Sequence, residues 1–242
     1  MQEPFIRSLE LVRERIADAT VYPFSIPSLA HLETLELHPR VTFLTGANAA
    51  GKSTLLEAIA VAADLNPEAG SRNFRFETRA SHSQLGDVLR LVRGARHPRH
   101  DFFLRAEAFF NVASEIESIG DIVDYGGVSL HEQSHGQSFI ALLTHRFGPD
   151  GLFLLDEPEA ALSPQGQLAM LSRMYELVRQ GCQLVIATHS PILLSFPDAR
   201  IYELSDEGIA TVEYDDSDLV RLYRSFLAAP ARYHRRLVEP DG

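Results

Sequence analysis

The sequence predicts an α/β fold in which helices cover both faces of a central, mostly parallel β-sheet. Three apolar runs carry this prediction. Residues 151–155 and 183–188 are short and largely apolar, as strands buried on both faces are. Residues 41–45 form a similar run, which leads into a glycine-containing loop and then into a helical pattern. Strands that alternate with helices in this way form parallel sheets.

The elements around the first strand follow from local patterns. Residues 5–18 place apolar side chains among charged ones at helical spacing, which favours an amphipathic helix packed on the body. Residues 21–37 combine prolines with short apolar runs, as edge strands and turns do. Residues 53–64, after the glycine loop, are rich in Ala, Leu and Ile and predict a helix.

The middle of the chain has a weaker pattern, in which we expect a strand at 101–110, a helix at 111–118, a loop at 120–129 and a helix at 134–146. A helix at 164–180 is predicted more strongly, because Pro164 suits its first turn and Gly181 ends it. Two short runs separated by Ser-Asp-Glu-Gly predict a hairpin at 201–204 and 209–214, and closing helices are expected at 217–238.

The length of 242 residues predicts one domain, spanning residues 1–242. Within it we expect a core of about residues 20–68 and 148–215, a small antiparallel β part, an inserted helical lobe of about 69–147 and a C-terminal helical segment, 216–242. No apolar stretch approaches the roughly 18 residues of a membrane span, and the N-terminus has no signal-peptide core. A single cysteine, Cys182, excludes an internal disulfide. A cytoplasmic protein without membrane insertion is therefore expected.

The most specific motif contains the only lysine among the 22 Lys and Arg residues, Lys52. It completes the pattern G-x-x-x-x-G-K-[ST], which binds the phosphates of a nucleoside triphosphate. An ammonium is a compact point charge, whereas a guanidinium is broad and forked, so a loop wrapped around phosphates needs lysine. The residues predicted to hold the nucleotide are Gly46, Ala47, Asn48, Ala49, Ala50, Gly51, Lys52, Ser53 and Thr54.

A second motif ends the apolar run at 151–155 with Asp156 and Glu157. A buried aspartate at a strand end is costly to ionise without a cation. We therefore expect Asp156 and the Ser53 hydroxyl to bind Mg²⁺, with Lys52 on the β- and γ-phosphates. Glu157 is expected to act as a catalytic group that polarises the attacking water.

The residues 156–163, Asp-Glu-Pro-Glu-Ala-Ala-Leu-Ser, and the later Ala-Thr-His-Ser at 187–190 resemble the core of ABC-type ATPases. The resemblance implies that His189 is the switch histidine that contacts the γ-phosphate. It also matches Ser134, Gly136 and Gln137 to the family signature, while His135 replaces a glycine. The motif Ser-His-Gly-Gln-Ser resembles that of small bacterial ATPases related to RecF, SMC and OLD-type proteins.

The resemblance further implies ATP and Mg²⁺ as cofactors, and an ATP-dependent homodimer. In that family the signature helix faces the phosphate loop of the opposite subunit, so two copies enclose two ATP molecules. The family has a glutamine that joins the core to the helical lobe, and its counterpart here is Gln84 or Glu107. The family also often stacks an aromatic side chain on adenine, for which Tyr22, Phe24 or neither is the counterpart.

The predicted function is a soluble ATP hydrolase that acts as a dimeric switch or clamp. The alternatives are an energising subunit of a membrane transporter and a regulatory module with incidental turnover. The net charge of −11 argues against a protein that binds nucleic acid over its whole surface. Arginines are concentrated between Arg72 and Arg105, however. This segment is interpreted as a solvated face or as a docking surface for DNA, RNA or a partner protein.

Overall fold

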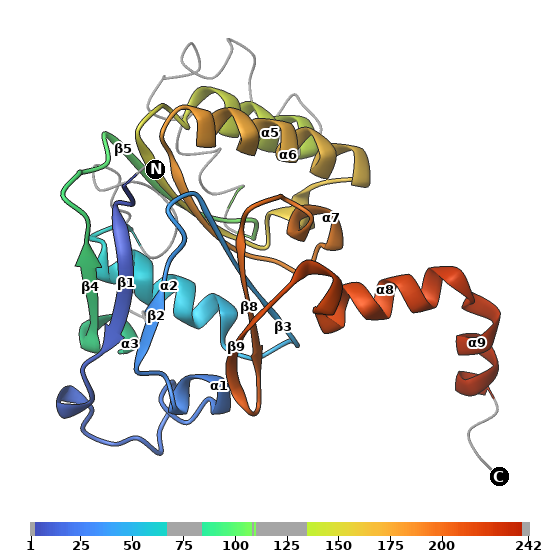
Figure 1. Ribbon diagram of the computed structural model, residues 1–242, viewed down its shortest axis with the longest axis horizontal. Coiled ribbons are helices and arrows are strands. Elements are labelled where there is room, and N and C mark those ends of the chain that lie inside the picture. Colours follow the sequence, from blue (N-terminus) through green and yellow to red (C-terminus); the bar gives the residue numbers. More distant parts are fainter. Residues whose placement is uncertain (1–2, 67–83, 108, 110–134, 239–242) are drawn as a thin grey trace.

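The computed structural model describes residues 3–66, 84–107, 109 and 135–238. Its centre is a six-stranded sheet in the order β5-β6-β7-β3-β8-β9, parallel except for the β8–β9 hairpin (Figure 1). The strands are β3 (Val41–Gly46), β5 (His100–Arg105), β6 (Gly151–Asp156), β7 (Gln183–Ala187), β8 (Arg200–Ser205) and β9 (Gly208–Val212). The predicted central parallel sheet and hairpin are therefore confirmed.

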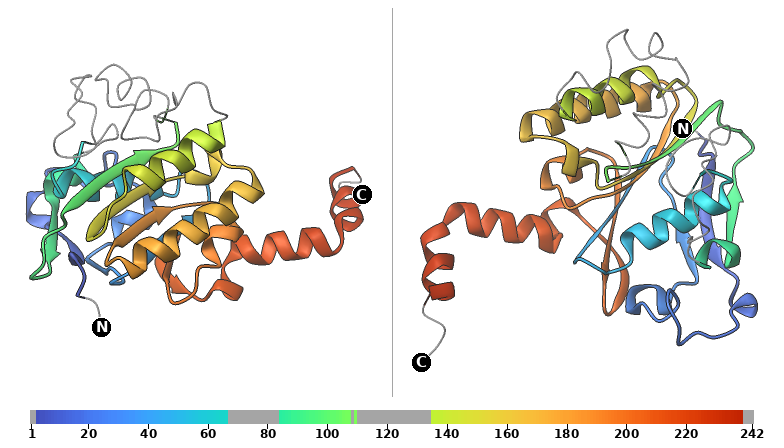
Figure 2. Two further views of the ribbon diagram at one scale, coloured as in Figure 1. Left: turned by 90° about the horizontal axis from the view of Figure 1, so that it is seen from above. Right: turned by 180° about the vertical axis from the view of Figure 1, so that it is seen from behind.

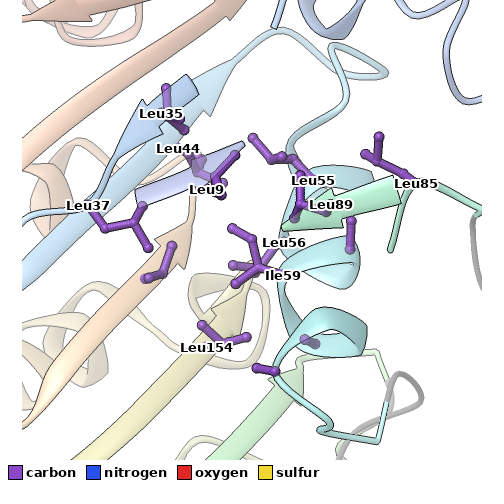
Figure 3. Close-up of a cluster of buried hydrophobic side chains, with 14 of the residues drawn as sticks. Leu9, Leu35, Leu37, Leu44, Leu55, Leu56, Ile59, Leu85, Leu89 and Leu154 are labelled. Atoms are coloured by element: carbon purple, nitrogen blue, oxygen red, sulfur yellow. The ribbon is translucent and has the colours of Figure 1, made fainter. Parts of the chain in front are cut away.

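One face of this sheet is covered by α2 (Lys52–Ala62), which lies between the central sheet and a second, antiparallel sheet. The second sheet has the order β2-β1-β4. Its strands are β1 (Ile6–Leu11), β2 (Thr34–Glu36) and β4 (Leu89–Arg93). Figure 3 shows Leu55, Leu56 and Ile59 of α2 between Leu9 of β1 and Leu154 of β6. This packing fixes the start of α2, where the nucleotide motif lies.

The opposite face of the central sheet is covered by α5 (His135–His145) and α6 (Pro164–Arg179). Their apolar side chains and those of the short helix α7 (Pro191–Leu194) form one core with the sheet. Inside it, the Phe147 and Phe153 rings stack with centroids 4.1 Å apart. The molecule therefore has the expected three-layer arrangement around the sheet.

The helix predicted for residues 5–18 is wrong. Residues 6–11 form β1, which pairs with both β2 and β4, and a 3₁₀ turn follows at Arg13–Arg15. Ile6 and Leu9 are both fully buried, although they are three residues apart. The pairing with β4 shifts its register between Ile6 and Ser8. A bulge of this kind breaks the two-residue alternation of a strand, which is why the pattern resembled a helix.

Other boundaries differ less. Residues 21–37 contain α1 (Pro27–Ala30) as well as the strand β2, and the strand predicted at 101–110 is shorter, as β5. The range 69–147, predicted as a helical lobe, includes β4 and β5, which are strands of the two sheets. In the described part of that range the helices are α3 (Leu85–Val88) and α5. The expected helix at 111–118 and loop at 120–129 lie outside the described residues.

The C-terminal segment forms α8 (Asp218–Ala228) and α9 (Pro230–Val238). The two helices are present as predicted, but they extend away from the body instead of closing over it (Figure 2). Within the described ranges, no helix is both long enough and apolar enough to cross a membrane.

Candidate nucleotide site

The loop between β3 and α2 has a backbone that two glycines make possible. Gly46 has φ +138°, and a Cβ there would lie 2.2 Å from the carbonyl oxygen of Leu204 on the adjacent strand β8. Gly51 has φ +94° and precedes the first residue of α2. Both glycines therefore fold the chain tightly enough for its amide groups to surround a bound anion at the helix N-terminus.

Lys52 is only 4% exposed, and its Nζ donates hydrogen bonds to the carbonyl oxygens of Gly46 at 3.2 Å and Ala47 at 2.9 Å. Burial lowers the pKa of Lys52, and the carboxylates of Glu157, Asp156 and Glu159 oppose that shift. The ammonium is thus desolvated inside the loop, where its attraction to a phosphate is strongest.

Ser53 and Asp156, 103 residues apart in sequence, meet at the end of β6, where the Ser53 hydroxyl donates to Asp156 Oδ1 at 2.9 Å. Burial raises the pKa of Asp156 to about 6, against the opposing effects of the Ser53 hydrogen bond and of Arg105. The Arg105 Nε lies 3.6 Å from Asp156 Oδ2. Two oxygen donors gathered at one desolvated point match the ligands that Mg²⁺ prefers.

Glu157 has a left-handed backbone conformation, with φ 49°, and its amide donates to the Ala187 carbonyl of β7 at 2.9 Å. Its carboxylate is 42% exposed and lies 3.6 Å from Nε2 of His189. Burial and the nearby Lys52 lower the pKa of His189, so the imidazole is neutral at pH 7. The His189 Nε2 is buried and makes no hydrogen bond. The carboxylate of a residue with a strained backbone and an unsatisfied imidazole nitrogen therefore lie close together.

The loop that carries His189 is held by two side chains that the sequence analysis did not select. Glu159 accepts a 2.5 Å hydrogen bond from the His189 amide and a 2.7 Å bond from the Thr188 hydroxyl. Gln167 of α6 accepts a 2.6 Å bond from the Ser190 hydroxyl. Glu159 was visible only as the fourth residue of the acidic motif, and Gln167 had no sequence signal because its role depends on tertiary contact.

A cavity of about 510 Å³ opens beside the loop, lined by Lys52, Ser53, Thr54, Tyr22 and Glu157 among others. Tyr22 is 66% exposed, and its hydroxyl lies 3.2 Å from the Thr54 hydroxyl. Phe24, the alternative for an adenine contact, is 7% exposed and belongs to the core beneath α2. Of the two aromatics, only Tyr22 is placed to stack on a base in this cavity.

The two alternatives for the glutamine position are also separated by the topology. β5 runs parallel to β6, and Arg105 at its end is paired in register with Asp156. The exposed residue Glu107 follows directly at this carboxyl edge of the sheet. Gln84 instead caps α3, which packs on α2. The topology therefore places Glu107, rather than Gln84, at the edge of the sheet that carries Asp156.

The signature residues are placed only in part. Ser134 lies outside the described residues, whereas Gly136 and Gln137 begin α5. A Cβ on Gly136 would lie 3.4 Å from the Ala161 carbonyl oxygen, in the turn that follows Glu157. Neither Gly136 nor Gln137 lines the cavity beside Lys52. Gly136 and Gln137 are therefore not positioned to contact a phosphate bound by the loop of their own chain.

The residues present fit a nucleoside triphosphate with Mg²⁺. The loop glycines allow the tight turn at positive φ, Lys52 is buried at the base of the loop, and His189 carries a buried nitrogen without a hydrogen bond among the described residues. No cluster of three or more His, Cys, Asp or Glu side chains in the described ranges could hold a metal by itself. A magnesium ion here would thus take ligands from Ser53, Asp156, phosphate oxygens and water.

Fold and site together define a P-loop nucleoside triphosphatase domain. Residues 41–107 and 122–195 match the family model described as "AAA domain, putative AbiEii toxin, Type IV TA system". The chain belongs to this AAA domain family. The matched residues include both acidic motif residues, the phosphate loop and His189.

Two curated relatives align with parts of the chain. An ABC transporter ATP-binding protein of Geobacter sulfurreducens is 33% identical over 110 residues, which are 45% of this chain and 39% of the relative. The energy-coupling factor transporter ATP-binding protein EcfA of Methanococcus maripaludis is 32% identical over 75 residues, 29% of this chain and 27% of the relative. The chain thus spans less than half of either relative.

Two solved structures are similar to the chain at low identity. An inward-facing metal-chelate type ABC transporter superposes with a TM-score of 0.50 and 16% identity, covering 89% of this chain and 85% of that one. The SMC head domain from Thermotoga maritima has a TM-score of 0.49 and 16% identity, covering 88% and 100%. The ABC-type ATPase resemblance and the predicted fold class are confirmed.

The raised pKa of Asp156 leads to a prediction about stability. Because the pKa of Asp156 in the folded protein, about 6, exceeds the ordinary aspartate value of 3.8, this carboxyl stabilises the fold fully only below about pH 4. That contribution is lost as the pH rises through 6. Asp156→Asn should therefore raise the free energy of unfolding of the nucleotide-free protein by about 2–3 kcal/mol at pH 8, and by much less at pH 4.5. Urea unfolding at the two pH values measures this.

The exposed Asp87→Asn is the matched control and should change neither value. The same Asp156→Asn variant should lose the Mg²⁺-dependent part of its nucleotide affinity. If the free energy of unfolding of Asp156→Asn at pH 8 were equal to or lower than that of the wild type, burial would not destabilise the ionised Asp156 carboxylate.

Proposed function

We propose that this protein is a Mg²⁺-dependent ATP hydrolase whose nucleotide state controls the association of two copies. The observation that carries the proposal is the convergence of five side chains at one edge of the central sheet. Lys52 and Ser53 come from the phosphate loop, Asp156 and Glu157 from the end of β6, and His189 from the end of β7. Parallel strands place all of these at the same edge of the sheet.

In this proposal each residue has a distinct task. The loop amides and Lys52 bind the β- and γ-phosphates, and Ser53 and Asp156 hold Mg²⁺, which neutralises phosphate charge when bound. Glu157 orients the attacking water and accepts its proton. Neutral His189 contacts the γ-phosphate through Nε2, and Glu159 keeps that imidazole in place through the His189 amide. Tyr22 stacks on the base.

The placement of the signature residues supports dimerisation. Gly136 and Gln137 lie outside the cavity of their own chain, so phosphate contacts from them require a second copy. Closure of two chains around ATP would then couple nucleotide binding to association. The division into core, lobe and C-terminal segment remains part of this proposal.

The alternative of an energising transporter subunit is favoured by one observation, the names of the two curated relatives. Their alignments cover less than half of each relative, however, and the Ser-His-Gly-Gln-Ser signature departs from the transporter pattern. The alternative of a regulatory module differs from this proposal only in that ATP hydrolysis would be incidental to its function.

The ion pairs of the segment 72–105 weaken the case for a nucleic-acid role. Its described arginines pair with carboxylates of the same chain, among them Arg90 with Glu10 and Arg96 with Asp150. Arg105 is occupied by Glu57 and Asp156. Arg72, Arg75 and Arg79 lie outside the described residues, so this docking surface stays a prediction.

Calorimetric titration of the intact protein tests the proposal. ATP with excess Mg²⁺ should give a saturable heat, ATP with EDTA a weaker one, and the purified protein should release phosphate from ATP. AMP is the control, because it lacks the phosphates that the loop and Lys52 bind. Absence of heat with Mg²⁺-ATP would reject the proposed function.

A further inference from the structure

The two carboxylate oxygens of Asp156 face different neighbours. Oδ1 accepts the hydrogen bond of the Ser53 hydroxyl at 2.9 Å, so the two side chains proposed to bind Mg²⁺ meet at this oxygen. Oδ2 lies 3.6 Å from Nε of Arg105, at the end of the neighbouring strand β5. Arg105 therefore faces the oxygen of Asp156 that Ser53 does not contact.

The register of β5 and β6 brings Arg105 to this position. Arg105 is paired with Asp156 in the parallel ladder, and the amide of Ala106 donates to the Asp156 carbonyl at 3.1 Å. Side chains two residues apart lie on the same face of a strand. Phe103 and Leu154, two residues before Arg105 and Asp156, belong to the core beneath α2, and Figure 3 shows Leu154 there. The Arg105 and Asp156 side chains therefore both lie on the α2 face of the central sheet.

The guanidinium of Arg105 is anchored by two further side chains. Its Nη2 donates a hydrogen bond to Oε2 of Glu57 on α2, and its Cζ lies over the Phe103 ring, 5.3 Å from the centroid. Only 27% of the Arg105 side chain and 15% of the Glu57 side chain are exposed. Glu57 follows Ser53 by four residues, so the two lie on the same face of α2. The helix therefore contacts Asp156 directly through Ser53 and indirectly through Glu57 and Arg105.

Arg105 has a donor that no described residue uses. Its Nε is buried and makes no hydrogen bond within the described part of the chain. The 3.6 Å separation from Asp156 Oδ2 is an ion pair, but it is longer than a hydrogen bond. A buried N–H without an acceptor costs free energy. A short movement of the Asp156 carboxylate toward Arg105 would satisfy this donor.

We propose that Arg105 is a positioning residue that fixes the orientation of the Asp156 carboxylate for Mg²⁺, and that Glu57 holds Arg105 in place. This inference rests on the proposed function, because it concerns the metal ion that accompanies ATP. Groups behind a ligating carboxylate orient it, and their loss typically weakens metal binding about 10–100-fold. Because Arg105 and Glu57 form an ion pair, Arg105 repels a cation at Asp156 less than an unpaired arginine would.

Calorimetric titration of the intact protein with ATP, once in excess Mg²⁺ and once in EDTA, tests this role. The ratio of the two affinities measures what the metal ion contributes. Arg105→Met should lower this ratio about 10–100-fold, because methionine fills space but cannot hold Oδ2 of Asp156. The affinity in EDTA should change little, since the loop and Lys52 still bind the phosphates. Arg105→Lys should recover only part of the ratio, because an ammonium lacks the fork that reaches both carboxylates.

Glu57→Gln separates orientation from charge. This substitution removes a negative charge near the site, so it would strengthen ATP binding if Arg105 acted only through its positive charge. We expect it instead to lower the ratio of the Mg²⁺ and EDTA affinities, because Arg105 loses its anchor. In the Arg105→Met background, Glu57→Gln should have little further effect on the ratio, since the side chain that Glu57 holds is gone.

Arg146→Met is the matched control and should leave the ratio unchanged. Arg146 also lies over a phenylalanine of β5, Phe102, whose side chain belongs to the core on the opposite face of the sheet. Thermal melting verifies that each variant is folded, and if Arg105→Met unfolds, the ratio for Glu57→Gln decides. An unchanged or raised ratio in the folded variants, or additive effects of the two substitutions, would overturn the role of Arg105. A wild type that gives no heat with Mg²⁺-ATP would instead reject the proposed function.

Discussion

Replacing Lys52 with methionine should weaken Mg²⁺-ATP binding by about 10²–10⁴-fold without unfolding the protein. A charge-assisted hydrogen bond contributes about 1.5–3 kcal/mol, and we expect the buried ammonium to make at least two to phosphate. The nucleotide-free fold should tolerate the change, because burial already disfavours the Lys52 charge and lowers its pKa. Titration calorimetry and thermal melting measure the two effects.

Lys52→Arg is the informative comparison. It keeps the charge, but a guanidinium is broader than the space beneath Gly46 and Ala47, where Nζ now lies within 3.2 Å of two carbonyl oxygens. We expect this variant to lose at least as much affinity as Lys52→Met. Wild-type affinity in Lys52→Arg would mean that positive charge alone is required, and that the compact shape of lysine is not.

Glu157→Gln should lower the rate of phosphate release by about 10²–10⁴-fold while Mg²⁺-ATP binding is retained. General base catalysis contributes an acceleration of about this size, and glutamine keeps the shape of the side chain but cannot accept the proton. The 42% exposure of Glu157 makes a large effect of the substitution on stability unexpected. Single-turnover phosphate release and calorimetry separate the two quantities.

Glu176→Gln on the surface of α6 serves as a matched control and should retain the wild-type rate, since Glu176 lies outside the site and pairs with Arg173. Glu157→Gln should also accumulate a dimer that requires Mg²⁺-ATP, because bound ATP is no longer consumed. An unchanged phosphate-release rate in Glu157→Gln would assign the base to another group.

The phosphate loop was predictable because its function depends on local backbone geometry. Gly46, Gly51, Lys52 and Ser53 act through the loop and the helix that they form themselves, and short-range spacing is sufficient to specify both. Asp156 and His189 were predictable for a related reason. Each ends an apolar strand, and the ends of neighbouring parallel strands meet at one edge.

The strand at residues 6–11 could not be recognised from the sequence alone. Its identity depends on pairing with β2 and β4, which are distant in sequence, and the bulge near Ser8 hides the alternation. The same limit applies to Gln183, whose side-chain amide bonds the backbone of Phe5, Ile6 and His38 and so joins the N-terminal strand to the central sheet.

The sequence by itself determined the class of chemistry, because a phosphate loop and an acidic strand end are encoded by residues close together in the chain. Only the tertiary structure placed Tyr22 at the cavity and Phe24 in the core, showed that Glu159 holds the His189 loop, and revealed that the C-terminal helices project from the body. Each of these depends on which side chains burial leaves accessible, and burial is a property of contacts between segments that are remote in sequence.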